Sequence, residues 1–193
     1  GVELLSKFDS IAGLSPRTQR CIAEKTIIAD FPVETSLYRQ GDPPSAFYML
    51  ESGRVKLYRQ SKDKRQILAL PAPGECLGAE SLATGGTSPF TAMALTSVTA
   101  LCVPPDPLQS LLDEHPDFQE VFLRLITDRL KQFVTLVHDL AFRDVTSRLA
   151  MVLVARADAE GQRGADGILV DRLLSQQEYA DMVGTVREVV SRT

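Results

Sequence analysis

The sequence predicts an α+β protein built from a β-roll, one long helix and a helix-turn-helix, in that order. Three observations predict this arrangement. Short apolar runs alternate with turn signals over residues 27–103, which is typical of a β-barrel or roll. An apolar heptad-like repeat follows at residues 123–140, and a capped helix with a glycine turn occupies residues 175–193. We therefore expect three parts with boundaries at 1–106, 107–144 and 145–193.

The composition is that of an ordinary globular protein, with 193 residues, 44% of them hydrophobic and 24% charged. No apolar run approaches the roughly 18 residues that a membrane-spanning helix needs, and no signal-peptide pattern is present, so we expect a cytoplasmic protein without a membrane partner. The net charge of −4 does not by itself indicate nucleic acid. DNA binding depends on local charge, however, so it is not excluded.

The residues that usually carry catalysis or bind metals form no recognisable set. The three cysteines, Cys21, Cys76 and Cys102, are scattered and match neither zinc nor iron–sulfur spacing. The two histidines and the scattered carboxylates give no Ser-His-Asp, Walker or H-E-x-x-H pattern. We predict that the protein is not an enzyme and has no metal site of its own.

Local signals place the elements before the long helix. Leucine, phenylalanine and isoleucine spaced over residues 4–11 predict a short amphipathic helix, and Ser15-Pro16 caps another. Turn signals at residues 39–44, 51–53, 73–74 and 84–86 separate the strands of the roll.

The long helix carries a regular apolar seam. From residue 123 to residue 140 the apolar positions step by 3, 4, 3, 4 and 3, which is the pattern of a coiled coil. We interpret the seam as a homodimer interface; burial of a single helix within one domain is the alternative. We expect a break near His115-Pro116 and a hinge near residues 142–146. The predicted interface consists of Leu123, Ile126, Leu130, Phe133, Val137 and Leu140.

The last 19 residues read as two helices joined by a tight turn. Ser175 and Glu178 form a capping box, and Gly184 supplies the left-handed residue that ends the first helix. Four polar residues at 187, 188, 191 and 192 then lie on one arc of the second helix. Arginine reads guanine and glutamate accepts from cytosine, so this arc is suited to read base edges.

Taken together, the ordered segments resemble the CRP/FNR superfamily of bacterial transcription regulators. The resemblance implies a double-stranded β-helix, a jelly-roll-like fold of the cyclic-nucleotide-binding type, then a dimerisation helix and a winged helix-turn-helix whose wing follows Thr193. It implies a homodimeric, effector-responsive, sequence-specific DNA-binding regulator that works with RNA polymerase. The matching segments are Gly41-Asp42, Phe47-Tyr48, residues 52–58, Pro73-Gly74-Glu75, Leu77-Gly78, residues 139–149 and residues 175–192.

The resemblance also assigns DNA contacts. Arg187, Glu188 and Arg192 match base-reading positions, and the spacing of Glu188, Ser191 and Arg192 is similar to the branch that reads TTGA-type half-sites. Two-fold symmetry implies a palindromic site with half-sites one DNA turn, about 34 Å, apart. Val186 stands where a Ser or Thr commonly caps the recognition helix, so Thr185 caps it instead or the cap is weak. The predicted DNA-binding residues are Ser175, Gln176, Gln177, Thr185, Arg187, Glu188, Ser191 and Arg192.

At the effector pocket the chain departs from the cyclic-AMP-binding pattern. Gly78 matches the glycine of the phosphate cassette, but Ala79 replaces the ribose-binding Glu, Pro89-Phe90 replaces the Arg-Ser pair, and Phe133-Val134 replaces the adenine-binding Thr-Ser pair. A buried phosphate without these groups is an unpaired charge, so we expect no response to cyclic AMP. Glu80 reaches the same space if the loop register shifts by one. The predicted pocket consists of Gly78, Ala79, Glu80, Pro89, Phe90, Phe133 and Val134.

Because these replacements are apolar, two interpretations remain open: a pocket filled by side chains, or an apolar effector such as haem, for which only His115 or His138 is available as a ligand. No iron–sulfur cluster is expected, since the cysteine cluster of that branch is missing. Phe133 belongs to both the seam and the pocket, so we expect it to couple them. The competing function is a cyclic-nucleotide-binding-like regulatory or haem-based sensor module that does not bind DNA directly.

Overall fold

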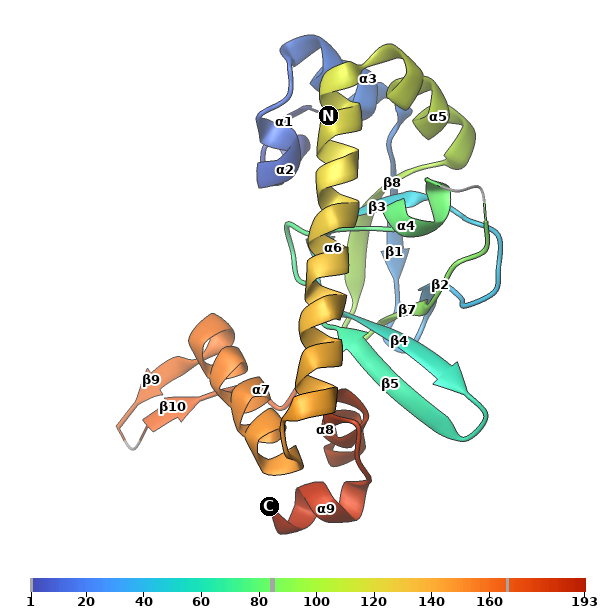
Figure 1. Ribbon diagram of the computed structural model, residues 1–193. Helices are drawn as coiled ribbons and strands as arrows, with labels where there is room; N and C mark the ends of the chain where they lie inside the picture. Colours follow the sequence, from blue (N-terminus) through green and yellow to red (C-terminus); the bar gives the residue numbers. More distant parts are fainter. Residues whose placement is uncertain (1, 84–85, 166) are drawn as a thin grey trace. The chain divides into compact units, whose positions relative to one another are not determined.

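The structure is a computed structural model that describes residues 2–83, 86–165 and 167–193 (Figure 1). It consists of two compact units. The first comprises Gly1–Arg59 and Ala69–Lys131, and the second comprises Gln60–Leu68 and Gln132–Thr193. Thr84 and Gly85, part of one predicted turn, lie outside the described residues. The mixed α+β class that the sequence predicts is confirmed.

The first unit begins with short helices. The single helix expected over residues 4–11 is wrong, because α1 (Val2–Leu5) and α2 (Asp9–Ala12) are separated at Phe8, whose extended backbone forms the N-cap of α2. The expected cap of α3 (Pro16–Lys25) is confirmed, since the Ser15 side chain accepts a hydrogen bond from the backbone N–H of Thr18 at 3.1 Å.

Two antiparallel four-stranded sheets form the predicted β-roll (Figure 1). One has the order β1-β8-β3-β6 and the other β2-β7-β4-β5. A short helix, α4 (Ala79–Leu82), follows β6. The strands are β1 (Ile27–Phe31), β2 (Ser36–Tyr38), β3 (Phe47–Ser52), β4 (Val55–Ser61), β5 (Lys64–Ala69), β6 (Cys76–Leu77), β7 (Thr91–Ala94) and β8 (Val98–Val103).

The predicted long helix is two helices, α5 (Pro105–Glu114) and α6 (Pro116–Phe142), and the expected break at His115-Pro116 is confirmed. The first turns of α6 complete the core of the first unit. The ring of Phe47 on β3 lies 6.1 Å from that of Phe118 and 5.7 Å from that of Phe122. All three side chains are buried, so one face of α6 is fixed against the β1-β8-β3-β6 sheet.

The second unit contains α7 (Val145–Glu160), the hairpin β9 (Gln162–Gly164) and β10 (Gly167–Leu169), α8 (Gln176–Val183) and α9 (Arg187–Arg192). Leu149 of α7 and Ala180 and Val183 of α8 are buried together with Leu174 in the loop before α8. The buried guanidinium of Arg156 donates to the hydroxyl of Tyr179 and to Glu160. It also donates to the backbone oxygen of Asp171 at 3.0 Å, which ties α7 to the segment that leads into α8.

No helix among the described residues is both long enough and apolar enough to cross a membrane.

Candidate DNA-binding surface and effector site

The helix-turn-helix has one strongly capped helix and one uncapped helix. Both bonds of the predicted capping box are present: the Ser175 hydroxyl accepts from the Glu178 N–H at 3.2 Å, and the Glu178 carboxylate accepts from the Ser175 N–H at 2.8 Å. Gly184 has the predicted left-handed backbone, with φ of 67°. Val186 is the N-cap of α9 and makes no side-chain cap, so the alternative in which Thr185 caps the recognition helix is wrong.

Most of the predicted DNA-binding residues come together on two adjoining hollows of the second unit. One hollow is lined by Arg187, Glu188, Ser191 and Arg192, the polar arc of α9. The other is lined by Ser175, Gln176, Gln177, Arg187 and Arg172. Arg187 links them, since its Nε donates to the side-chain oxygen of Gln176 at 3.4 Å. Thr185 lines neither hollow.

Arg172 is an addition that sequence reasoning missed. It precedes the cap of α8 by three residues and has no helical periodicity to mark it. In the structure it lies beside the first turn of α8, where free backbone N–H groups and the helix dipole favour anions. This hollow is therefore suited to a phosphate group, whereas the arc of α9 presents the donors and the acceptor that read bases.

In the first unit, the start of α4 forms one side of the predicted effector pocket. Gly78 is its N-cap with φ of 90°, and a Cβ there would lie 2.5 Å from the Ala46 backbone oxygen, so only glycine fits. Ala79 and Phe90 are buried. The ring of Phe90 lies 6.2 Å from that of Tyr38.

The other two predicted pocket residues, Phe133 and Val134, belong to the second unit. Phe133 is half-buried and Val134 is 61% exposed.

A buried ion pair includes one residue of the predicted pocket, Glu80. The guanidinium of Arg129, on α6, lies 3.3 Å from the carboxylate of Glu80, on α4, and their side chains are only 7% and 16% exposed. Arg129 also donates to the backbone oxygen of Cys76 at 3.4 Å. Arg129 is thus an arginine of α6 that lies beside a predicted pocket residue, away from the positions matched to the Arg-Ser pair. The Glu80 side chain is largely buried and faces Arg129, which is compatible with the alternative in which Glu80 reaches the pocket.

Two buried hydroxyl groups have no hydrogen-bond partner among the described residues, those of Tyr38 and Ser88. Burial raises the pKa of Tyr38 well above its ordinary value, and the nearby Glu80 carboxylate raises it further while Arg129 lowers it. The Tyr38 hydroxyl is therefore a neutral donor within electrostatic reach of the ion pair. An unsatisfied buried hydroxyl costs about 1–3 kcal/mol, which favours a polar group bound beside it.

Neither histidine is placed to ligate haem. His115 is buried, and its Nδ1 lies 3.1 Å from the Thr18 hydroxyl at the junction of α3, α5 and α6. His138 belongs to the second unit, and its 57%-exposed side chain contacts Asp139 and the ring of Phe142. The residues present therefore do not fit a haem site.

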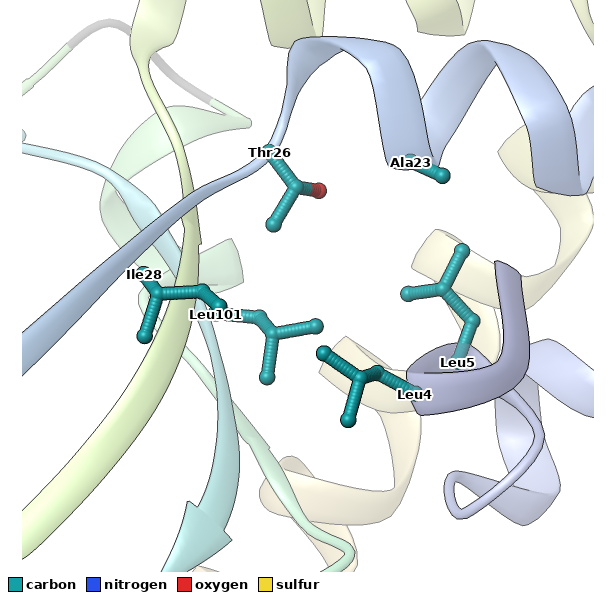
Figure 2. Close-up of a pocket in the computed structure, with 6 residues that line it drawn as sticks. All are labelled: Leu4, Leu5, Ala23, Thr26, Ile28 and Leu101. Carbon is teal, nitrogen blue, oxygen red and sulfur yellow. The ribbon is translucent and has the colours of Figure 1, made fainter. Parts of the chain in front are cut away.

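A separate apolar pocket of about 60 Å³ lies between the N-terminal helices and the β1-β8 edge of the roll (Figure 2). Its one polar side chain, Thr26, already donates to the backbone oxygen of Ile22 at 2.7 Å. None of the predicted effector residues lines it. We interpret it as a packing gap. It is lined by Leu4, Leu5, Ala23, Thr26, Ile28 and Leu101.

The predicted seam of α6 is divided by exposure. Leu123, Leu130 and Val137 are 60–65% exposed, whereas Ile126, Phe133 and Leu140 are half-buried. The exposed set recurs every seventh residue, and the half-buried set lies three positions further along the helix, about 60° away around its axis. One row of the seam is thus exposed to solvent, and the neighbouring row is partly buried within the protein.

Comparison with known proteins places these features in a family context. A family model of the cyclic nucleotide-binding domain matches residues 29–115. A CRP-like cAMP-activated global transcriptional regulator from Mycobacterium tuberculosis is 29% identical over 191 residues, covering 98% of this chain and 85% of that protein. The global nitrogen regulator of Synechocystis is 32% identical over 169 residues, covering 86% and 75%. A solved structure of a CooA variant from Carboxydothermus hydrogenoformans is 26% identical, with a TM-score of 0.71 and coverage of 89% and 75%.

Proposed function

Since the chain belongs to the CRP/FNR superfamily of bacterial transcription regulators, which bind DNA, we propose that it is a homodimeric, effector-responsive regulator that reads a palindromic site. The observation that carries the proposal is the exposed arc of Arg187, Glu188 and Arg192. It follows a complete capping box and adjoins the hollow at the start of α8. We also propose that the regulator reads TTGA-type half-sites, contacts RNA polymerase and acts in the cytoplasm.

A gel-shift titration with a palindromic TTGA-containing duplex tests the DNA-binding proposal. We expect a sequence-dependent, salt-sensitive shift, because phosphate contacts release counterions. The single substitutions Glu188→Ala and Arg192→Ala should each reduce discrimination between the palindrome and a mutated duplex by about 1–3 kcal/mol.

Arg163→Ala is the matched control, since this exposed arginine on β9 lines neither hollow. Absence of any sequence-dependent shift from the wild-type protein would favour the competing function, a regulatory module that does not bind DNA.

We further propose that the effector is a small anion other than cyclic AMP, bound inside the roll of the first unit. Two of the three replacements that argue against cyclic AMP lie within this unit, at Ala79 and at Pro89-Phe90. Arg129 supports an anionic ligand, because it is a buried cation whose side chain is only 7% exposed and lies 3.3 Å from the Glu80 carboxylate.

The buried Tyr38 hydroxyl adds a neutral donor close to this pair. An anion that accepts from Arg129 and Tyr38 displaces Glu80 and thereby acts on α4. The alternative in which side chains fill the pocket leaves the buried hydroxyl unsatisfied.

Heat-stability measurements with small carboxylates, inorganic phosphate and cyclic AMP test the effector class. We expect a carboxylate or phosphate to raise the melting temperature of wild type but not of Arg129→Met, and cyclic AMP to have no effect. Stabilisation by cyclic AMP alone would contradict this proposal.

A further inference from the structure

The outer part of the β4–β5 hairpin, residues 60–68, belongs to the same compact unit as the helix-turn-helix. The side chain of Gln66 donates to the backbone oxygen of Met182, at the end of α8, at 2.9 Å. A Cβ built on Gly184 would lie 3.4 Å from the side-chain oxygen of Gln66. The hairpin therefore lies against the turn that joins α8 to the recognition helix α9.

The tip of this hairpin is basic. Lys62, Lys64 and Arg65 are exposed, and Asp63 is the one acidic residue among residues 60–68. Lys64 is two residues from Gln66 and lies on the same face of the strand, about 7 Å away along it. Lys62 is at the turn, two residues before β5. Lys64 thus lies within a side chain's reach of the turn that precedes the recognition helix, and Lys62 and Arg65 add positive charge at the same tip.

The rest of the unit is poor in positive charge. Residues 132–193 contain seven arginines and no lysine, against nine acidic residues. Arg148 and Arg156 donate to backbone oxygens, Arg148 to that of Val183 at 2.8 Å and Arg156 to that of Asp171 at 3.0 Å. Arg143 forms an ion pair with Asp139 at 2.8 Å. A DNA-binding surface needs cations to displace counterions from phosphates, and this segment alone supplies few.

We propose that the tip of the β4–β5 hairpin is an accessory DNA contact, in which Lys62, Lys64 and Arg65 bind backbone phosphates beside the groove that α9 enters. The inference rests on the proposed DNA-binding function and adds to it a strand pair from the β-roll. Duplex DNA is the partner that fits, because the cations lie next to the motif that reads it. Phosphate contacts position a protein without reading sequence, so the hairpin contributes affinity and not specificity.

The test is a salt titration of DNA affinity with the double variant Lys64→Gln/Arg65→Gln. Lys62 is kept, because its φ of 52° at the turn makes substitution there a test of the turn as well. At 0.1 M salt each lost phosphate contact should weaken binding about eightfold, and two contacts about 60-fold. The slope of log affinity against log salt should become less negative by about 0.9 per contact. The loss should be equal for the palindrome and for an unrelated duplex.

The matched control is Arg17→Gln/Arg20→Gln, which removes two exposed arginines from α3 in the first unit. We expect it to bind as the wild type does. Phosphate-ethylation interference should also show phosphates that matter to wild type and to the control but not to the hairpin variant.

Wild-type affinity and salt slope in the hairpin variant, or an equal loss in the control, would overturn the accessory contact. Absence of binding by wild type would instead refute the regulator proposal. The two failures are therefore distinguishable.

Discussion

Two glycines of the first unit share a backbone conformation and differ in their surroundings. Gly41 has φ of +88° and Gly53 has φ of +85°, both in the left-handed region that side chains rarely adopt. A Cβ on Gly41 would meet nothing within 4 Å. A Cβ on Gly53 would lie 2.2 Å from the backbone oxygen of Ser97, which cannot move without shifting the chain just before β8.

Substituting Gly41 and Gly53 separates two effects on the free energy of unfolding: the left-handed backbone conformation and the steric clash of an added Cβ. We expect Gly41→Ala to lower the free energy of unfolding by about 1–2 kcal/mol, the cost of a left-handed residue with a Cβ. Gly53→Ala should cost more than about 3 kcal/mol, because the backbone clash adds to the same term. Urea denaturation followed by circular dichroism measures both. Equal losses in the two variants would show that the contact with Ser97 is not a constraint.

Arg129 shows where reasoning from the sequence reaches its limit at the scale of a residue. Apolar periodicity assigns charged residues of a helix to its solvated side. Arg129 is buried nonetheless, because its partner Glu80 is supplied by a helix 49 residues earlier in the chain. Local patterns do not pair residues so far apart. Gly184 and Ser175, by contrast, were predicted correctly, because each acts on backbone within a few residues of itself.

At the scale of elements, α8 and α9 differ in how they begin. Ser175 satisfies a backbone donor at the start of α8, whereas Val186 at the start of α9 has an extended backbone, with φ of −110° and ψ of 154°, and no acceptor. That backbone is the conformation in which a Ser side chain caps a helix. The recognition helix is therefore the weaker of the two at its N-terminus.

Replacing Val186 with Ser should stabilise α9. Relative to Val186→Ala, which also removes the valine side chain, we expect Val186→Ser to raise the free energy of unfolding by about 1 kcal/mol, through a hydrogen bond to the first turn of the helix. Val186 is 58% exposed, so little packing is lost in either variant. Chemical denaturation measures the difference. If the serine and alanine variants are equally stable, the start of α9 does not adopt a cappable geometry in solution.

The difference between local signals and contacts distant in the chain also explains which elements the sequence predicts correctly. The roll, the break at His115 and the two helices of the motif follow from turn residues, prolines and caps, which act locally. The single N-terminal helix was wrong, because Leu5, Phe8 and Ile11 satisfy helical spacing and are all fully buried, yet the chain turns at Phe8. Periodicity shows which side chains are buried together but not whether one continuous helix buries them.

At the scale of the whole molecule, α6 carries an exposed apolar stripe. Leu123, Leu130 and Val137 recur every seventh residue and are 64%, 60% and 65% exposed. A regular apolar stripe of this kind is costly in water and is typical of a coiled-coil seam. In the homodimer that we propose, a second copy of the same helix supplies the complementary stripe, since a two-fold interface places each surface against itself.

Placing a charge in this stripe should separate the subunits. We expect Leu130→Glu to raise the dimer dissociation constant by roughly 100-fold or more, because each of the two leucines lost contributes about 1.5–3 kcal/mol when buried. Gln132→Glu is the matched control: it also adds one negative charge, but on an exposed position about 200° further round the helix. Sedimentation velocity at micromolar concentration measures the change. Palindromic DNA should then bind the leucine variant far more weakly, because each half-site is occupied independently. A Leu130→Glu protein that sediments as a dimer would place the subunit interface elsewhere and leave the stripe of α6 to another partner.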